Sequence, residues 1–223
     1  MKRFQVKVCG NNNLENFKEI AAIEPDYVGF IFYPKSKRFV KDKAIFDIFP
    51  NAEKVGVFVN DSIENILEKV EQYQLDVVQL HGDETAYFCE KLINQKHQRL
   101  ITDENFLDFK IWKAVGIQSK DDFQQLTTYQ QVVDSFVFDT KSSDYGGTGR
   151  KFNWQLLTNY QLSTPFLLSG GIELEDALLL KNFQHPRCIG FDINSGFESA
   201  PGIKKANEVK QFIDTIDGRI EQN

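Results

Sequence analysis

The sequence predicts an α/β fold of the (β/α)8 barrel (TIM barrel) class, formed as a single domain over residues 1–223. Short runs of β-branched and aromatic residues alternate with amphipathic stretches, which indicates parallel strands joined by right-handed helical crossovers. Eight such units fill the chain at about 27 residues each, close to the minimum for a closed barrel. No linker rich in Pro, Gly or Ser divides them.

Eight short segments, in chain order, are rich in Val, Ile and Phe and run into turn residues, which is the pattern of strands. They are residues 4–9, 27–32, 54–60, 76–81, 111–116, 135–140, 166–169 and 188–193. An open doubly wound sheet is the alternative, and it usually carries a GxGxxG turn after its first strand. Here the first strand runs into Gly10-Asn11-Asn12-Asn13, which lacks that motif and favours the barrel.

Apolar residues recur at helical spacing between these strands. The expected helices cover residues 14–24, 62–73, 84–93, 119–129, 173–183 and 204–216. Ser62 and Ser119 stand at two of the starts, each followed three residues later by Asn or Asp, as at a capped helix N-terminus. Residues 41–49 carry a weaker helical pattern, and residues 153–160 a short one.

Composition excludes several classes of protein. The chain is 41% hydrophobic with 20 Phe, enough to bury a core and avoid disorder. The net charge of −6 offers no basic surface for nucleic acid. Three cysteines without a CxxC pair argue against a disulfide framework or a structural zinc site. No segment approaches the ~18 apolar residues of a membrane span, and the N-terminus lacks a signal-like apolar region, so we expect a cytoplasmic protein.

The alternation of side chains along each strand sorts residues into an inward and an outward set. We expect the consistently apolar set to pack against the helices; in the third and eighth strands this set includes Val55, Val57 and Ile189. The opposite set then points into the barrel, mostly at the carboxyl ends of strands, where barrel enzymes keep their active sites. Its polar members are Cys9, Asn60, His81, Asp139, Asp192 and Asn194.

Structural roles are the alternative for several of these residues. A Cys on a strand is often a small buried hydrophobe. His81 is as well suited to a structural role, capping the following turn or orienting Asp83, as to a functional one. Lys7 and Asp192 share the inward face and suit an interior ion pair. Asp139 is harder to explain structurally, because a buried carboxylate is costly without a partner or a function. The other two cysteines, Cys89 and Cys188, are expected in the core.

Glycine-rich loops follow the last three strands. Gly170 and Gly171 after the seventh strand, and Ser195 and Gly196 after the eighth, would let backbone N–H groups approach a phosphate, with a short helix opening at Ser195. Residues 141–151 form a longer glycine-dense loop that suits either a cover over the site or a plain surface loop. Arg38 lies in a basic loop after the second strand, and either pairs with a carboxylate or is simply solvated.

Motifs along residues 4–216 resemble those of the phosphoribosylanthranilate isomerase family of tryptophan biosynthesis. The specific blocks are KVCG at 7–10, FYPKSKR at 32–38, VGVFVN at 55–60, VQLHG at 78–82 and DYGGTG at 144–149. The resemblance implies an Amadori rearrangement of N-(5-phosphoribosyl)anthranilate, with Cys9 as base and Asp139 as acid, by an enzyme without cofactor or metal. It also implies a phosphosugar substrate, no nucleic-acid or membrane partner, and a monomer or homodimer. The substrate-binding residues so implied are Arg38, His81, Gly147, Gly170, Gly171, Asp192, Asn194, Ser195 and Gly196.

The chain departs from the family pattern in two places, the run Asn11-Asn12-Asn13 and Asn194 where Ser is usual; both leave the acid and base in place. Asp139 needs burial or a nearby anion to keep its proton near pH 7, and Cys9 needs nearby positive charge, which Lys7 can supply. Other functions fit the sequence less well. A metal-dependent epimerase needs metal ligands on other strands, and residues 27–32 offer no His. Indole-glycerol-phosphate synthase needs a catalytic lysine and glutamate set, of which the inward face clearly offers only Lys7. A non-catalytic phosphosugar sensor would not need Cys9 and Asp139.

Overall fold

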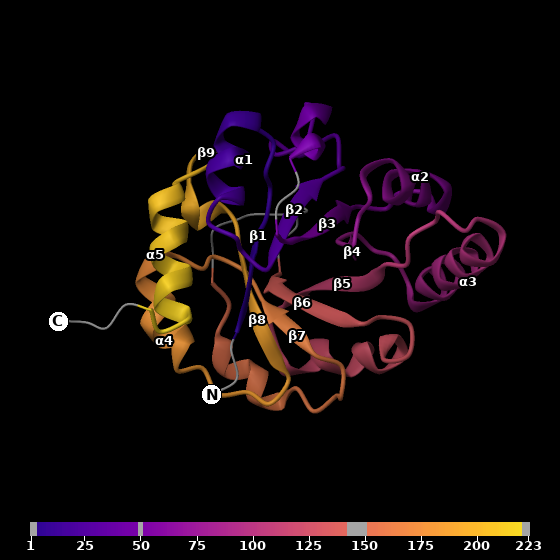
Figure 1. Ribbon diagram of the computed structural model, residues 1–223. Coiled ribbons are helices and arrows are strands. Elements are labelled where there is room, and N and C mark those ends of the chain that lie inside the picture. Colours follow the sequence, from indigo (N-terminus) through magenta and orange to yellow (C-terminus); the bar gives the residue numbers. More distant parts are fainter. Residues whose placement is uncertain (1–3, 49–50, 142–150, 220–223) are drawn as a thin grey trace.

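The computed structural model describes residues 4–48, 51–141 and 151–219. Eight parallel strands follow one another in sequence order and close into a barrel, because β8 pairs with β1 (Figure 1). The strands are β1 (Gln5–Val8), β2 (Tyr27–Ile31), β3 (Glu53–Phe58), β4 (Val77–Leu80), β5 (Lys110–Ile117), β6 (Ser135–Thr140), β7 (Phe166–Leu168) and β8 (Cys188–Ile193). The predicted fold class is confirmed, and each predicted strand overlaps an observed one.

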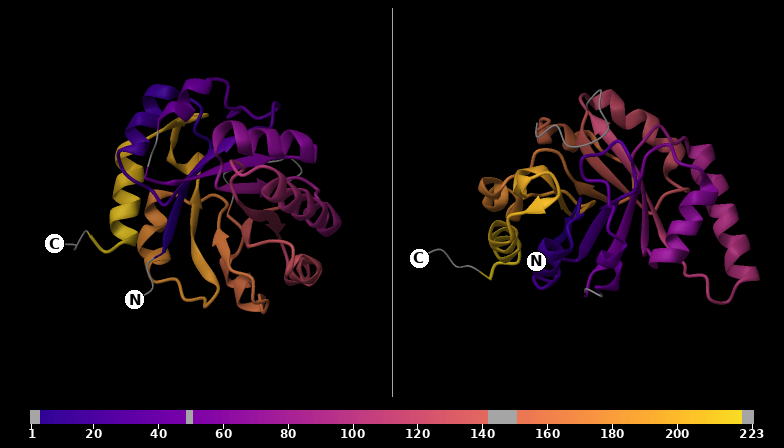
Figure 2. Two further views of the ribbon diagram at one scale, coloured as in Figure 1. Left: turned by 45° about the vertical axis from the view of Figure 1, so that its right-hand side comes forward. Right: turned by 90° about the horizontal axis from the view of Figure 1, so that it is seen from above.

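Helices cover the outside of the barrel (Figure 2). The α-helices are α1 (Leu14–Ala21), α2 (Ile63–Tyr73), α3 (Ala86–Thr102), α4 (Ala177–Lys181) and α5 (Ala206–Ile216). The 3₁₀ helices are η1 (Lys43–Asp47), η2 (Lys120–Tyr129), η3 (Trp154–Asn159), η4 (Leu174–Asp176) and η5 (Ser195–Phe197). A hairpin of β9 (Glu198–Ala200) and β10 (Ile203–Lys204) follows η5. No helix in the described part of the chain has the length and apolar character to cross a bilayer.

Several helix predictions need correction. The helix expected at 84–93 continues to Thr102, because good helix formers extend it after the apolar periodicity fades. The stretches at 41–49, 119–129 and 153–160 contain the 3₁₀ helices η1, η2 and η3, and the helix expected at 173–183 is divided into η4 and α4. In η2 the hydroxyls of Thr127 and Thr128 donate to carbonyls three residues back. The last helix begins at Ala206, since Lys204 pairs in β10.

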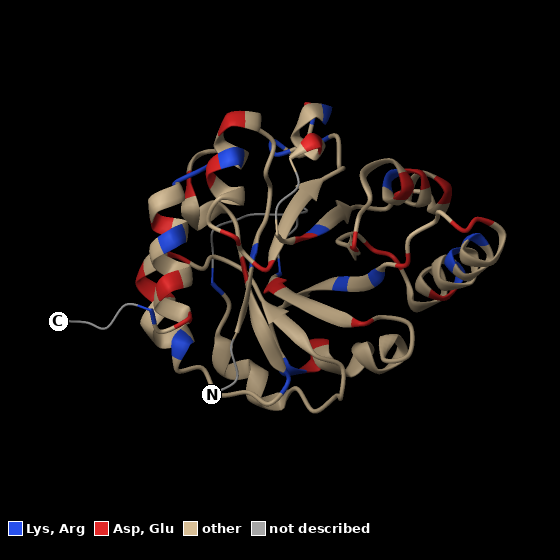
Figure 3. Cartoon of the chain, in the orientation of Figure 1, with Lys and Arg blue, Asp and Glu red and all other residues tan. Residues whose placement is uncertain are grey.

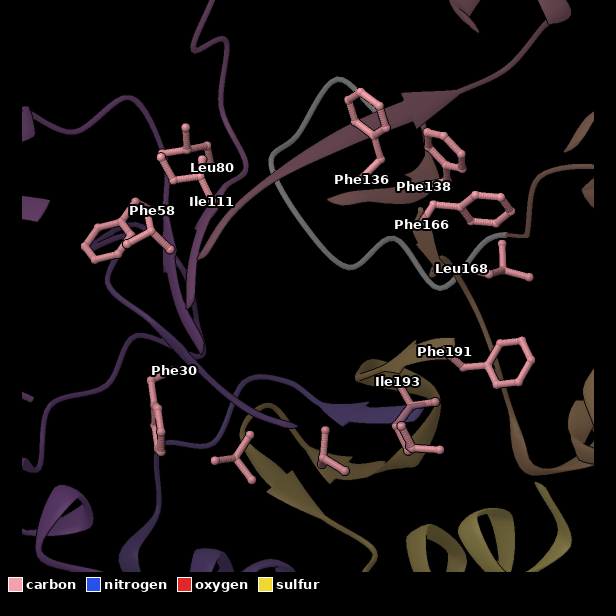
Figure 4. Packing of buried hydrophobic residues seen from close by; sticks show 14 of the residues in the cluster. Phe30, Phe58, Leu80, Ile111, Phe136, Phe138, Phe166, Leu168, Phe191 and Ile193 are labelled. Atoms are coloured by element: carbon pink, nitrogen blue, oxygen red, sulfur yellow. The ribbon is translucent and has the colours of Figure 1, made fainter. Parts of the chain in front are cut away.

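Two apolar cores lie on the two sides of the barrel wall. The outer core joins the outward faces of the strands to the helices, and its strand residues form a ring around the barrel (Figure 4). The inner core consists of residues on or directly after strands and includes no helix residue: Cys9, Tyr27, Val55, Val57, Val77, Trp112, Ala114, Val137 and Leu167. Tyr27 and Trp112 meet edge to face, with ring centroids 4.9 Å apart.

The inward and outward assignment is correct in β1, β4 and β6, but it is reversed throughout β3 and wrong at Ile189 of β8. Val55 and Val57 pack in the inner core, whereas Phe58 joins the outer aromatic cluster. Both faces of β3 are apolar, so alternation alone could not separate them. In β8 the pairing register shifts between Phe166 and Leu167 of the neighbouring strand, and Ile189 packs against the inner core.

Three aspartates close the amino ends of strand pairs. Each precedes an even-numbered strand and accepts a hydrogen bond from an N–H near the start of the strand before it. The bonds join Asp26 Oδ2 to Val6 N (2.8 Å), Asp76 Oδ2 to Lys54 N (2.7 Å) and Asp134 Oδ2 to Ile111 N (2.7 Å). These carboxylates accept backbone N–H groups and so fasten β1, β3 and β5 each to the strand that follows it.

Charged residues of both signs are interspersed over the outer helices (Figure 3). This distribution agrees with the absence of a basic excess in the sequence. A second group of charged residues lies toward the centre of the barrel, and this group builds the candidate site.

Candidate active site

The carboxyl ends of all eight parallel strands meet at one rim of the barrel. At this end β1 and β8 contribute an ion pair: Lys7 Nζ lies 2.9 Å from Asp192 Oδ2, and both side chains are buried. Burial alone would lower the pKa of Lys7. The interactions with Asp192 and with the Cys9 sulfur have a larger opposite effect, so the pKa of Lys7 is raised. The ammonium group is therefore retained inside the barrel, and the predicted ion pair is confirmed.

Cys9 directly follows β1 and is 5% exposed. Gly29 of β2 makes room for it, because a β-carbon on Gly29 would lie 2.8 Å from Cys9 Sγ and 3.2 Å from Lys7 Cε. Burial raises the pKa of the Cys9 thiol. The positive charges of Lys7 and Lys204 lower this pKa, whereas the negative charge of Asp192 raises it further. Cys9 thus rests as a thiol beside an ammonium group that favours its ionisation.

Asp139 lies near the carboxyl end of β6, with its side chain 19% exposed. Burial raises the pKa of Asp139 to about 6; the negative charge of Asp192 acts in the same direction, and the hydrogen bond from Thr140 N acts against it. Gly170 packs closely here, since a β-carbon on it would lie 2.8 Å from Asp139 Oδ1. The carboxyl group therefore holds a proton much closer to neutral pH than a solvated aspartate does.

His81 follows β4 and faces Asp139, with His81 Nε2 3.6 Å from Asp139 Oδ2. On its other side, Gln79 Nε2 lies 3.1 Å from His81 Nδ1. Burial, together with the positive charges of Lys113 and Lys7, lowers the pKa of His81 to about 3. The imidazole is accordingly neutral at neutral pH.

Arg38 reaches the same rim from the loop after β2. It does not project freely: its Nε and Nη2 make a forked ion pair with Glu198, which is 4% exposed, at 2.9 and 2.6 Å. Lys204 Nζ lies 2.6 Å from Glu198 Oε1 and 2.7 Å from Asn194 Oδ1. Although burial acts in the opposite direction, Arg38 and Lys204 lower the pKa of Glu198, which stays ionised between two cations.

This cluster lies beside Cys9. A β-carbon on Gly10 would lie 2.8 Å from both Arg38 Cδ and Asn194 Oδ1. The departures from the family pattern have local functions here, because Asn13 caps α1 and Asn11 Nδ2 bonds carbonyls of β1 and β2. These asparagines support the segment that carries Cys9.

The loops after β7 and β8 touch each other. Gly196 lies so close to Ile172 that a β-carbon on it would come within 2.2 Å of the Ile172 carbonyl oxygen. Gly170 and Gly171 have φ of +89° and +64°, a region that favours glycine. Ser195 opens the short helix η5, as predicted. Gly147 lies outside the described residues.

Most predicted site residues share one rim: Cys9, Arg38, His81, Asp139, Gly170, Gly171, Asp192, Asn194, Ser195 and Gly196. Asn60 is the exception among the inward predictions. It has φ +50° and bonds the loop after β4, with Asn60 Oδ1 accepting from Asp83 N at 2.7 Å and Asn60 N donating to Glu84. Cys89 and Cys188 are fully buried in the outer core, as predicted.

Sequence reasoning missed four residues that shape the site: Gly29, Gln79, Glu198 and Lys204. Gln79 and Gly29 lie on inward faces, so the alternation pattern contains that signal. Glu198 and Lys204 belong to a hairpin that has no counterpart in the repeating strand and helix pattern. No local signal identifies them.

The rim thus combines a carboxyl group whose pKa is raised toward neutrality, a thiol beside an ammonium group, and two glycine-bearing loops. These are components suited to proton transfer to and from a bound ligand. Among residues 4–48, 51–141 and 151–219, no cluster of three His, Cys, Asp or Glu side chains is arranged to hold a metal ion.

Comparison with known proteins assigns the family. A family model described as N-(5′-phosphoribosyl)anthranilate (PRA) isomerase matches residues 6–215. The N-(5′-phosphoribosyl)anthranilate isomerase of Parabacteroides distasonis is 44% identical over 216 residues, covering 95% of this chain and 92% of that protein. The crystal structure of the enzyme from Thermotoga maritima superposes with a TM-score of 0.78 at 32% identity, covering 96% and 99% of the two chains.

A further solved phosphoribosylanthranilate isomerase, in complex with reduced 1-(o-carboxyphenylamino)-1-deoxyribulose 5-phosphate, matches with a TM-score of 0.76 at 30% identity, covering 96% and 99%. The matches extend over nearly the whole barrel, including the strands that carry Cys9 and Asp139. The chain belongs to the N-(5′-phosphoribosyl)anthranilate isomerase family.

Proposed function

We propose that this chain converts N-(5′-phosphoribosyl)anthranilate into 1-(2-carboxyphenylamino)-1-deoxyribulose 5-phosphate with Asp139 as general acid and Cys9 as general base. The isomerase activity and its place in tryptophan biosynthesis follow from the family. The reaction turns an aminoaldose into an aminoketose, and it needs one proton donor and one proton acceptor.

The first step uses the proton held by Asp139. Transfer of this proton to the ribose ring oxygen breaks the bond between that oxygen and C1′, and the nitrogen lone pair forms the C1′=N bond of a Schiff base. Asp139 is left as a carboxylate. Its raised pKa, about 6, suits this transfer, since a much larger fraction of Asp139 than of a solvated aspartate is protonated at neutral pH.

The second step uses Cys9 as a thiolate. It removes the proton from C2′, the electrons of that bond form a C1′=C2′ double bond, and the C1′=N electrons return to nitrogen. The resulting enolamine tautomerises to the ketone: the hydroxyl group on C2′ loses its proton as a proton is added to C1′. Lys7 stabilises the thiolate, because it lies against the Cys9 sulfur and keeps its own proton.

The proposed acid, Asp139, has a lower pKa than the proposed base, Cys9, which is the reverse of the order that would favour the reactive protonation states. The acid, Asp139, loses its proton more easily than the base, Cys9, because burial raises the pKa of both groups from very different starting values. The reactive combination of protonated Asp139 and ionised Cys9 is therefore a minor form at neutral pH. Lys7 and Lys204 increase its population by favouring the thiolate.

Substrate contacts follow from the rim. The loops at Gly170–Gly171 and Ser195–Gly196 are proposed to hold the phosphate through backbone N–H groups, which glycine allows a ligand to approach. Arg38, already aligned by Glu198, is proposed to bind the anthranilate carboxylate. The complex with a reduced phosphosugar product in a relative supports a phosphosugar ligand. A monomer or homodimer remains our proposal; a relative from Thermotoga maritima is described as dimeric.

One observation carries the assignment of acid and base. Cys9 and Asp139 come from strands far apart in the barrel, yet the charges of the same Lys7–Asp192 pair act on both. The shared surroundings of the two side chains support the assignment of Cys9 as proton acceptor and Asp139 as proton donor.

The test is turnover measured as loss of substrate fluorescence for Cys9→Ser and Asp139→Asn, with Cys89→Ser as the matched control for a buried cysteine. Each site variant is expected to lose roughly 10²- to 10⁴-fold in kcat while still binding ligand. Cys89→Ser should retain turnover, and complementation of a tryptophan auxotroph lacking this step should follow the same order. Near-normal turnover by Cys9→Ser would remove Cys9 from the mechanism.

A further inference from the structure

A buried amide stands behind the imidazole of the active site. Gln79 of β4 shares the inward face with His81 and is 1% exposed. Its Nε2 lies 3.1 Å from His81 Nδ1, while its Oε1 is buried without a hydrogen-bond partner among the residues that the structure describes. Neither Nε2 nor Oε1 of Gln79 has a role in the proposed mechanism. A buried amide oxygen without a hydrogen bond is unfavourable, so the presence of Gln79 at this position calls for an explanation.

The contact with Gln79 determines where the imidazole proton lies. An amide NH2 group can only donate, so His81 Nδ1 accepts and the single proton of neutral imidazole lies on Nε2. That nitrogen faces Asp139 Oδ2 at 3.6 Å. The reverse amide orientation would bury an NH2 group without an acceptor, and would direct the Nε2 lone pair at the carboxylate.

We propose that Gln79 is a positioning residue that holds His81 as the Nε2–H tautomer, so that His81 donates toward Asp139 and cannot take its proton. If the proton were on Nδ1 instead, Nε2 would accept from protonated Asp139 and compete with the substrate for the catalytic proton. With the proton on Nε2, the carboxylate left after proton transfer gains a donor. This role rests on the proposed function of Asp139 as the acid.

The surrounding charges keep His81 neutral. Lys113 of β5 and Lys7 of β1 disfavour the imidazolium, Asp139 of β6 faces its Nε2, and Asp192 of β8 is paired with Lys7. The tautomer rather than the charge of His81 is thus the variable that Gln79 controls.

The tautomer is measured directly by ¹⁵N NMR of the imidazole nitrogens, which the chain makes simple because it has three histidines, His81, His97 and His185. In the wild type, His81 Nδ1 should resonate as an unprotonated nitrogen and Nε2 as a protonated one. In Gln79→Glu the carboxylate accepts from Nδ1, so the proton should move to Nδ1. A wild-type spectrum with the proton on Nδ1 overturns the proposal whatever the activity is.

Kinetics tests the consequence. Gln79→Glu is expected to lose roughly 10- to 100-fold in kcat with KM nearly unchanged, and to shift the acidic limb of its pH profile. Gln79→Met keeps the volume without the amide and should lose the tautomer preference, so it serves if Gln79→Glu fails to fold. Gln211→Glu, the same change on the exposed face of α5, should alter neither readout.

A switched tautomer with unchanged kcat and pH profile would show that Gln79 has no part in the proton transfer. Failure of the proposed function itself would appear separately. In that case Asp139→Asn would retain turnover while the His81 spectrum stayed as expected.

Discussion

Asp139→Asn should make the protein more stable and inactive at once. Asp139 has a pKa raised from 3.8 to about 6, mainly by burial. Between these two values the folded protein binds more protons than the unfolded chain, so stability falls as pH rises through this window. At pH 8 the ionised carboxylate costs about 3 kcal/mol, from roughly two pKa units at about 1.4 kcal/mol each.

Asparagine removes the charge while its Oδ1 can still accept the hydrogen bond that Thr140 N donates at 2.7 Å. The variant should therefore gain about 3 kcal/mol over the wild type at pH 8 and less than about 1 kcal/mol at pH 4, where the wild-type carboxyl is protonated in the folded state. For a domain of this size the gain at pH 8 corresponds to a rise in Tm of roughly 6–12 °C.

Urea denaturation at pH 4 and pH 8, with turnover measured in parallel, tests this reasoning. Asp47→Asn is the control, because it removes the same charge from the exposed face of η1 and should change stability by less than about 0.5 kcal/mol at either pH. If Asp139→Asn is no more stable than the wild type at pH 8, or is stabilised equally at pH 4 and pH 8, then burial does not make ionisation of Asp139 destabilising.

Four further outcomes are expected. Gly29→Ala should lower kcat at least about tenfold and cost about 1–3 kcal/mol in urea denaturation, because the new β-carbon meets Cys9 Sγ at 2.8 Å and Cα at 3.0 Å. Arg38→Met should raise KM roughly 10- to 100-fold with little change in kcat, through loss of the carboxylate contact; an unchanged KM would place the ring elsewhere. Asp76→Ala should cost about 1–3 kcal/mol of unfolding free energy without affecting kcat, since it frees an N–H of β3 far from the rim. The pH profile of kcat/KM should have a plateau between about pH 6 and the pKa of Cys9. At pH values below the plateau kcat/KM should fall because the Cys9 thiolate disappears, and at pH values above the plateau it should fall because protonated Asp139 disappears.

Alternation along the chain was enough to predict the barrel and much of its site. Strands with one polar and one apolar face, such as β1 and β6, placed Cys9 and Asp139 inward correctly. The same rule was wrong where both faces are apolar, as at Val55 and Val57, because the inner core of the barrel is itself apolar. It was also wrong at Ile189, where a register shift changes which side chains face inward.

Pairs that join distant parts of the chain have no signature in the sequence. Arg38 and Glu198 are 160 positions apart, and only closure of the barrel brings the loop after β2 against the β9–β10 hairpin. The raised pKa of Asp139 likewise depends on how deeply neighbouring strands bury it. Periodicity and residue type therefore specify most of the polar groups that point into the barrel. The distances and burial that set the protonation of those groups arise only once all eight strands have closed.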